Sequence, residues 1–332
     1  MTHVIESLPI LILYPHSRCN CRCIMCDIWK VDSAQEISLA DLERHGADIE
    51  KLGVQRVVLS GGEPLMHSDL FRLCGFLRNR GIRVTILTTG LLLKRNAEKL
   101  IDFVDDVIVS LDGPPEIHDR IRRLPGAFEL LAEGVGAIHR LRPGFPIAAR
   151  STVQRQNCGT LRETARTAHG LGLRSISFLA ADLTSSAFNR ERGWTAGHQA
   201  EVGLTVAEVA VLENEIEALV MEWGETGFVL EKPQKLRAIA RHFRSHLGLI
   251  EPVAPLCSAP WVSAVIESDG TVRPCFFHPL IGKVGERSLL EVLNGPEAVA
   301  FRANLDVETN PVCRRCVCSL NFKASSLSSA AL

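Results

Sequence analysis

Short apolar segments alternate with amphipathic segments over the first half of the chain. Six apolar segments lie at residues 8–14, 56–59, 83–87, 107–111, 147–153 and 175–179. Most of them are nearly continuously hydrophobic, as strands covered on both faces are. Amphipathic stretches between them predict helices at residues 39–52, 68–80, 94–103, 127–141 and 160–171. Repeated strand–helix units predict an α/β fold with a parallel sheet, and six units favour a partial or open barrel over an eightfold one.

The pattern changes after residue 181. Residues 182–204 are polar and contain three glycines, which predicts a long loop or linker at the end of a first domain at 8–204. Thr205 and Glu208 form a capping box that opens a helix in a connector at 205–250. We interpret the apolar stripe of this helix as core packing, although it could also line a substrate site.

A third unit is expected at 251–322. Asp269-Gly270 between apolar segments predicts a β-hairpin, and Ser288 with Glu291 opens a short helix that ends near Leu305. The last ten residues, 323–332, are rich in Ser and Ala and are expected to form a flexible tail.

Composition excludes several classes of protein. Of the 332 residues, 46% are hydrophobic and 23% are charged, so a sizeable core is possible. The formal net charge of −1 gives no support for nucleic-acid binding or for a polybasic membrane anchor. No apolar run approaches the roughly 20 residues that span a bilayer, and we interpret the first apolar segment as a strand and not a signal peptide. We therefore expect a cytoplasmic protein with no nucleic-acid or membrane partner.

The 11 cysteines point to metal or redox chemistry. Their odd number and the lack of an export signal argue against a disulfide scaffold. Cys74 and Cys158 stand apart and are interpreted as buried hydrophobic residues. The other nine fall into two groups, which are Cys19, Cys21, Cys23 and Cys26, and Cys257, Cys275, Cys313, Cys316 and Cys318.

The first group contains a C-x3-C-x2-C loop directly after the first predicted strand, formed by Cys19, Cys23 and Cys26. Three thiolates on one loop can hold three corners of a four-iron cluster, whereas a fully ligated cluster uses four. One iron would then stay open to another ligand, as the metal of a catalytic zinc site does. A zinc site is the alternative interpretation of this loop.

This arrangement resembles the radical SAM superfamily. In that family the loop follows the first strand of a partial (β/α)6 barrel, and S-adenosylmethionine (SAM) chelates the unique iron of a [4Fe–4S] cluster. An electron from the cluster cleaves SAM to methionine and a 5′-deoxyadenosyl radical, which abstracts hydrogen from the substrate. The resemblance therefore implies that Cys19, Cys23 and Cys26 carry the catalytic cluster.

Further motifs match in the same order along the chain. Residues 60–64, Ser-Gly-Gly-Glu-Pro, resemble the GGEP motif of the family, and Thr89 follows the third predicted strand. The resemblance assigns SAM contacts to Gly61, Gly62, Glu63, Pro64, Thr89, Ser110, Asp112 and, more weakly, Arg150. His118, Asp119, Arg122 and residues 126–128 also resemble a family stretch, for which no individual role is expected. Met25 departs from the aromatic residue that often precedes the third cysteine, and Cys21 is interpreted as a bystander.

The second group resembles the SPASM/twitch extension of some radical SAM enzymes, because Cys257 is followed by Gly270-x4-Cys275 and then by Cys313-x2-Cys316. The resemblance implies one auxiliary [4Fe–4S] cluster with those four cysteines as ligands, and Cys318 competes with Cys316 for the last place. Structural zinc is the alternative. A leftover thiol could donate a hydrogen atom to a product radical, but an inert role is favoured, as it is for His16 and His278.

We therefore expect a radical SAM enzyme with a C-terminal auxiliary-cluster extension and an electron donor such as flavodoxin or ferredoxin. The auxiliary cluster would transfer electrons or anchor substrate. A small-molecule substrate, such as a sugar, aminocyclitol or natural-product intermediate, is favoured because only 18 residues precede Cys19, too few for an N-terminal peptide-recognition domain. Maturation of a ribosomal peptide and a non-catalytic iron–sulfur or zinc scaffold are the alternatives.

Overall fold

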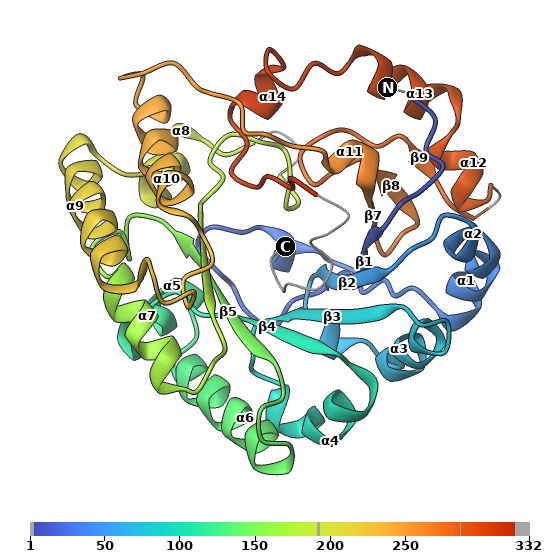
Figure 1. The fold of residues 1–332 in the computed structure, drawn as a ribbon, viewed down its shortest axis with the longest axis horizontal. Coiled ribbons are helices and arrows are strands. Elements are labelled where there is room, and N and C mark those ends of the chain that lie inside the picture. Colours follow the sequence, from blue (N-terminus) through green and yellow to red (C-terminus); the bar gives the residue numbers. More distant parts are fainter. Residues whose placement is uncertain (1–2, 191–192, 286, 323–332) are drawn as a thin grey trace.

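Six parallel strands form the frame of the fold, and the computed structural model describes residues 3–190, 193–285 and 287–322 (Figure 1). The strands stand in sequence order across a curved sheet, each hydrogen-bonded to the next. They are β1 (Ile10–His16), β2 (Arg56–Gly61), β3 (Arg83–Thr88), β4 (Asp106–Ser110), β5 (Ile147–Val153) and β6 (Ile176–Ala180). The predicted α/β fold with six parallel strands is confirmed.

Helices cover the outer face of this sheet (Figure 1). They and two short 3-10 turns are η1 (Ile28–Lys30), α1 (Leu39–Arg44), α2 (Gly46–Lys51), η2 (Pro64–Met66), α3 (Leu70–Arg78), α4 (Leu93–Phe103), α5 (Pro115–Arg122), α6 (Ala127–Leu141) and α7 (Leu161–Gly170). The single helix expected at 39–52 is two helices, because His45 leaves the helical conformation at a ψ of 3°. Helix α5 was not predicted, since polar His118 and Arg122 occupy two of its buried positions and leave no hydrophobic period.

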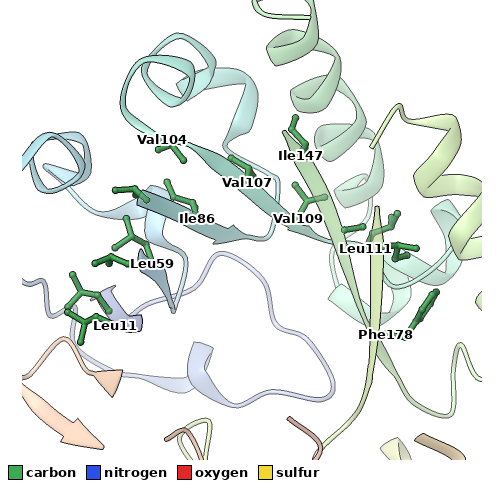
Figure 2. Close-up of a cluster of buried hydrophobic side chains, with 14 of the residues drawn as sticks. Leu11, Leu59, Ile86, Val104, Val107, Val109, Leu111, Ile147 and Phe178 are labelled. Carbon is green, nitrogen blue, oxygen red and sulfur yellow. The ribbon is translucent and has the colours of Figure 1, made fainter. Parts of the chain in front are cut away.

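The alternation of side chains along each strand divides the core into two layers. Leu11 and Leu59 point outward into the large cluster beneath the helices, as do their counterparts on later strands (Figure 2). Ile10, Ile12 and Val58 point the other way, into a second cluster inside the barrel. Both faces of the strands are therefore covered, which is why their sequences are almost continuously apolar.

The C-terminal region extends the same sheet. Strand β7 (Ser263–Ile266) pairs in parallel with β1, and β8 (Thr271–Arg273) returns antiparallel beside it, so the predicted hairpin is confirmed. The remaining elements are α11 (Ala259–Val262), β9 (Gly282–Lys283), α12 (Leu289–Leu293), α13 (Pro296–Asn304) and α14 (Pro311–Arg314). The one helix expected up to Leu305 is two, because α13 starts anew at Pro296, which cannot donate a backbone hydrogen bond.

The segment expected to be a loop at 182–204 is partly helical. It contains α8 (Ala196–Val202), capped by Thr195, whose side chain accepts a hydrogen bond from the backbone N–H of His198. Glycines at 193, 197 and 203 hid this short helix from the sequence pattern. The capping box at Thr205 is confirmed at the start of α9 (Val206–Trp223), and α10 (Pro233–His246) packs against α9 and β6.

The last described residues lie inside the barrel. Leu320 and Phe322 pack against the inner cluster around Ile12 and Val58. The expected flexible tail, 323–332, lies outside the described residues. No helix in the described part of the chain is both long enough and apolar enough to cross a membrane.

Candidate functional site

The loop with the first three cysteines leaves the carboxyl end of β1 and is held from two sides. On one side, the backbone N–H groups of Gly62 and Glu63 donate to the carbonyls of His16 (3.2 Å) and Arg18 (2.8 Å). On the other side, the N–H of Ile24 donates to the carbonyl of Ile121 at the end of α5 (3.1 Å). The loop that carries Cys19, Cys23 and Cys26 is therefore seated between the turn after β2 and the C-terminus of α5.

The three thiols share a buried environment. Burial raises the pKa of Cys19, and it raises the pKa of Cys26 to about 12. Cys23 differs, because a hydrogen bond from the Cys21 thiol, together with the nearby Arg122 guanidinium, lowers its pKa. A negative charge on Cys23 raises the pKa of both Cys19 and Cys26, which places the three sulfurs within electrostatic reach of one another.

The donor set suits an iron–sulfur cluster. All 11 cysteines are free thiols, so none is used in a disulfide. Among the described residues, no three His, Cys, Asp or Glu side chains are arranged to hold a single metal ion. A four-iron cluster is wider than a single ion, and its positive irons would stabilise thiolates that burial otherwise disfavours.

The two glycines after β2 make room for this loop. Gly61 has a φ of +91°, and a Cβ there would lie 2.4 Å from the Tyr14 ring. A Cβ on Gly62 would lie 2.2 Å from the Arg18 carbonyl oxygen. The glycines thus permit a close approach between the chain's own segments.

Glu63 is fully buried beneath the same turn. Its carboxylate accepts hydrogen bonds from the N–H of Leu65 (3.0 Å), the hydroxyl of Thr88 (2.7 Å) and the N–H of Thr89 (2.7 Å). Burial raises its pKa, although these bonds oppose the shift. Thr89 in turn donates from its hydroxyl to Asn20 in the cysteine loop (3.0 Å). Glu63 therefore ties the ends of β2 and β3 together, and direct SAM contacts from Gly61, Gly62, Glu63, Pro64 and Thr89 stay predictions.

Asp112 belongs to a second buried network, at the ends of β4 and β5. Its side chain is 0% exposed, pairs with Arg122 (2.5 Å) and accepts the N–H of Thr152 (2.9 Å). Asn157 donates to its backbone carbonyl (2.9 Å). Asp112 thus supports the cysteine loop through Arg122, and its SAM contact, like that of Ser110, stays a prediction.

A strap formed by residues 182–190 and 193–194 crosses to the cysteine loop, which the sequence did not reveal. Trp194 donates from its indole to the Asp27 carboxylate (2.8 Å), one residue after Cys26. Arg190 donates to the carbonyl of Met25 (2.7 Å) and pairs with Asp182 (2.9 Å), with both side chains almost fully buried. The one sequence signal was Trp194 itself, a large aromatic residue in a polar segment.

The second group of cysteines lines one cavity of about 100 Å³ inside the barrel. Its other walls are mainly apolar, including Ile12, Val58 and Leu320. The structure thus brings together all five predicted candidates, which are Cys257, Cys275, Cys313, Cys316 and Cys318. Such a dry pocket of thiols fits an iron–sulfur cluster, for the same reasons as the first loop.

Neighbouring side chains complete this cavity. Arg150 lines it, with its Nε donating to the Ser177 hydroxyl (3.2 Å), so this predicted SAM contact lies beside the second group of cysteines. The His278 ring lies 3.3 Å from the Cys313 sulfur, whereas His16 pairs with Glu36 (3.1 Å). Cys74 and Cys158 are buried away from both groups, as expected.

A larger cleft of about 480 Å³ opens beside the first loop. It extends from Gly62 and Tyr14 to Phe276 and Phe277, which follow Cys275. An ion pair between Glu267 and Arg273 (2.7 Å), on the β7–β8 hairpin, lines its rim. The cleft therefore extends from the turn after β2, beside the first cysteine loop, to the residues that follow Cys275.

Two family models match the chain. Residues 13–168 match the radical SAM superfamily, and residues 257–317 match an iron–sulfur cluster-binding domain known as SPASM. The first match contains the early cysteine loop and the turn after β2. The second contains Cys257, Cys275, Cys313 and Cys316 and ends just before Cys318.

Curated relatives include enzymes with different substrates. The pre-heme d1 synthase of Dinoroseobacter shibae is 26% identical over 93% of this chain and 78% of its own length. The PqqA peptide cyclase of Ruegeria pomeroyi is 26% identical over 90% of this chain and 77% of its own. The Fe-coproporphyrin III synthase of Methanosarcina barkeri is 32% identical, but the match spans 46% of this chain and 39% of that protein.

Solved structures share the fold. The SuiB protein of Streptococcus suis, solved with bound S-adenosylmethionine, superimposes with a TM-score of 0.68. The superposition covers 95% of this chain and 73% of SuiB. Because the sequence identity is 15%, the likeness shows a shared fold only.

Proposed function

This chain belongs to the radical SAM superfamily, and we propose that it is an enzyme that cleaves S-adenosylmethionine to abstract hydrogen from a bound organic substrate. The observation that carries the proposal is the seating of Cys19, Cys23 and Cys26 on one loop at the carboxyl end of β1. Ligands of parallel α/β folds bind at this end of the strands.

The cofactors would supply the hard chemistry, and the chain would supply placement. The chemistry that a bound cluster and SAM would supply is the one-electron reductive cleavage of SAM, which would allow hydrogen to be abstracted from the substrate. Cys19, Cys23 and Cys26 would each ligate one iron. Glu63 fixes the ends of β2 and β3 beneath the loop through the three hydrogen bonds described above. The strap with Arg190 and Trp194 covers the loop, which would limit the access of water to the radical.

Cys257, Cys275, Cys313 and Cys316 are the proposed ligands of an auxiliary [4Fe–4S] cluster. Cys316 is favoured over Cys318 because it forms the C-x2-C pair with Cys313 that resembles the SPASM/twitch extension. The family match, which ends at residue 317, supports the same choice. This cluster would accept an electron from a substrate radical or anchor the substrate.

A small organic molecule is the proposed substrate. The cleft of about 480 Å³, which extends from the turn after β2 to the residues that follow Cys275, falls within the roughly 300–1,000 Å³ typical of small-molecule sites. The near full-length likeness to a pre-heme d1 synthase supports this choice. A ribosomal peptide is the second candidate, because the likeness to the PqqA peptide cyclase extends over a similar length. A flavodoxin or ferredoxin would deliver the electron in either case.

Anaerobic reconstitution tests the reaction type. We expect about eight irons per chain, as two four-iron clusters require, and 5′-deoxyadenosine on reduction with dithionite in the presence of SAM. The triple variant Cys19→Ala, Cys23→Ala, Cys26→Ala should keep about four irons and lose all cleavage. Zinc in place of iron, or iron without cleavage, would instead support a scaffold protein.

Single variants test the auxiliary ligands. Cys313→Ala and Cys316→Ala should each lower the iron content by up to about four per chain, whereas Cys318→Ala should retain it. Loss of iron from Cys318→Ala with retention in Cys316→Ala would reverse the assignment.

Isotope transfer tests the substrate class. Deuterium should pass into 5′-deoxyadenosine from the small-molecule fraction of a deuterated cell extract. Transfer from the peptide fraction alone would select the peptide candidate.

A further inference from the structure

Arg122, the last residue of α5, carries a buried charge that the proposed reaction does not use. Its side chain is 7% exposed, and its Nη1 donates to the Cys23 sulfur at 3.4 Å. Its Nη2 pairs with the Asp112 carboxylate at 2.5 Å. The guanidinium therefore bridges the end of β4 and a proposed cluster ligand that lies 99 residues earlier in the chain.

The surroundings fix this bridge in place. Asp112 is held by the backbone N–H of Thr152, and the carbonyl of Arg122 itself accepts the N–H of Arg22 in the cysteine loop (3.3 Å). The Cys21 thiol, which is 1% exposed, donates a second hydrogen bond to Cys23. The Cys23 sulfur thus receives a charged donor and a neutral donor, while its own loop is tied to the helix that carries the charge.

Donors of this kind affect an iron–sulfur cluster in a predictable direction. Reduction adds one negative charge to the cluster and its thiolates, with no proton required. Hydrogen bonds to ligand sulfurs and nearby positive charge stabilise the more negative state, and they act strongly where water is excluded. The contrasting case is Arg302, which is equally buried but donates to the carbonyls of His3 and Leu293 (2.7 and 2.6 Å), as a structural arginine would.

We propose that Arg122, positioned by Asp112, raises the reduction potential of the cluster on Cys19, Cys23 and Cys26 through its hydrogen bond to the Cys23 sulfur. Arg122 is on this view a positioning residue that sets how readily the cluster accepts an electron. The inference rests on the proposed function only in requiring that the loop holds a cluster.

The test is a redox titration of the anaerobic holoprotein followed by electron paramagnetic resonance. The signal that disappears in Cys19→Ala identifies the first cluster, and the auxiliary cluster serves as an internal control in every sample. Arg122→Gln removes the charge, Arg122→Lys keeps a charge without the planar fork that bridges two acceptors, and Cys21→Ala removes the neutral donor. Arg162→Gln is the matched control, because it removes a guanidinium paired with Glu215 (3.0 Å) between α7 and α9.

We expect Arg122→Gln to lower the equilibrium constant for reduction of the first cluster at least tenfold, where each tenfold is about 59 mV for one electron. Arg122→Lys and Cys21→Ala should lower it by less, and Arg162→Gln should not change it. The potential of the auxiliary cluster should stay constant throughout.

An unchanged potential in Arg122→Gln with full iron content would overturn the inference. If Arg122→Gln loses its iron, the potential of the first cluster is measured in Arg122→Lys. A native potential in Arg122→Lys would then overturn the inference. SAM cleavage is scored separately: a native protein that holds the cluster without cleaving SAM would refute the proposed function and leave this measurement intact.

Discussion

Replacing Gly62 by alanine should remove the first cluster while leaving most of the fold in place. The added Cβ would lie 2.2 Å from the Arg18 carbonyl oxygen and 2.9 Å from that of His16. Both are backbone atoms, so the contact cannot be relieved by rotating a side chain. The Arg18 carbonyl would have to retreat by about 0.8 Å to reach even a 3.0 Å contact.

The displacement breaks identifiable interactions. The bonds from Gly62 to His16 (3.2 Å) and from Glu63 to Arg18 (2.8 Å) hold the loop down. Losing both costs about 0.5–1.5 kcal/mol each, and overpacking adds about 1–3 kcal/mol. The expected destabilisation of about 2–6 kcal/mol is a large part of the roughly 5–15 kcal/mol that keeps a domain folded. Because Arg18 directly precedes Cys19, the first cluster should be lost along with these bonds.

Two measurements on the anaerobically purified variant check this expectation. Iron should fall from about eight to about four per chain, and urea unfolding followed by circular dichroism should move to lower denaturant. Gly170→Ala is the matched control, because a Cβ there meets nothing within 4 Å. A Gly62→Ala protein with native iron and an unfolding free energy within about 0.5 kcal/mol of the native value would refute the steric argument.

Three further predictions follow from buried polar groups. Arg190→Met should lower the free energy of unfolding by about 3–5 kcal/mol, because it leaves the Asp182 carboxylate buried and unpaired. Urea unfolding should show that the double variant with Asp182→Asn recovers much of this loss. Strictly additive losses would contradict the pairing. Glu63→Gln should lower the free energy of unfolding by about 1–3 kcal/mol in the same assay. The carboxylate now accepts a hydrogen bond from the Thr89 N–H, whereas the amide would place its own N–H against that donor. A native denaturation midpoint would show that Glu63 does not hold the strand ends together. Burial lowers the pKa of His118 to about 3. Below about pH 6.5 the unfolded chain therefore binds more protons than the folded chain. From this group alone, the free energy of unfolding should fall on acidification by up to about 1.4 kcal/mol per pH unit. His118→Phe should show a shallower fall between about pH 7 and pH 5, and equal slopes in the two proteins would contradict the assignment.

Local pattern determined much of this protein. The six strands were predictable because residues buried on both faces must be apolar, and the run at 107–109 satisfies that condition without a break. The three thiols of the first loop were also predictable from the sequence, because a cluster bound by one short loop needs ligands that are closely spaced along the chain. The capping boxes at Thr205 and Ser288 involve residues three apart, and both formed as expected.

Tertiary structure decided which polar side chains meet the cysteine loop. Arg122 contacts Cys23 across 99 residues, and Trp194 contacts Asp27 across 167 residues. Neither contact produces a periodic pattern in the sequence. Hydrophobic periodicity reports that a position is buried, whereas a buried arginine or aspartate interrupts that pattern and gives no sign of its partner. The pairing of β7 with β1 was also decided by the tertiary structure. The backbone hydrogen bonds that join two strands are common to nearly all residue types, so the sequence does not indicate which strands pair.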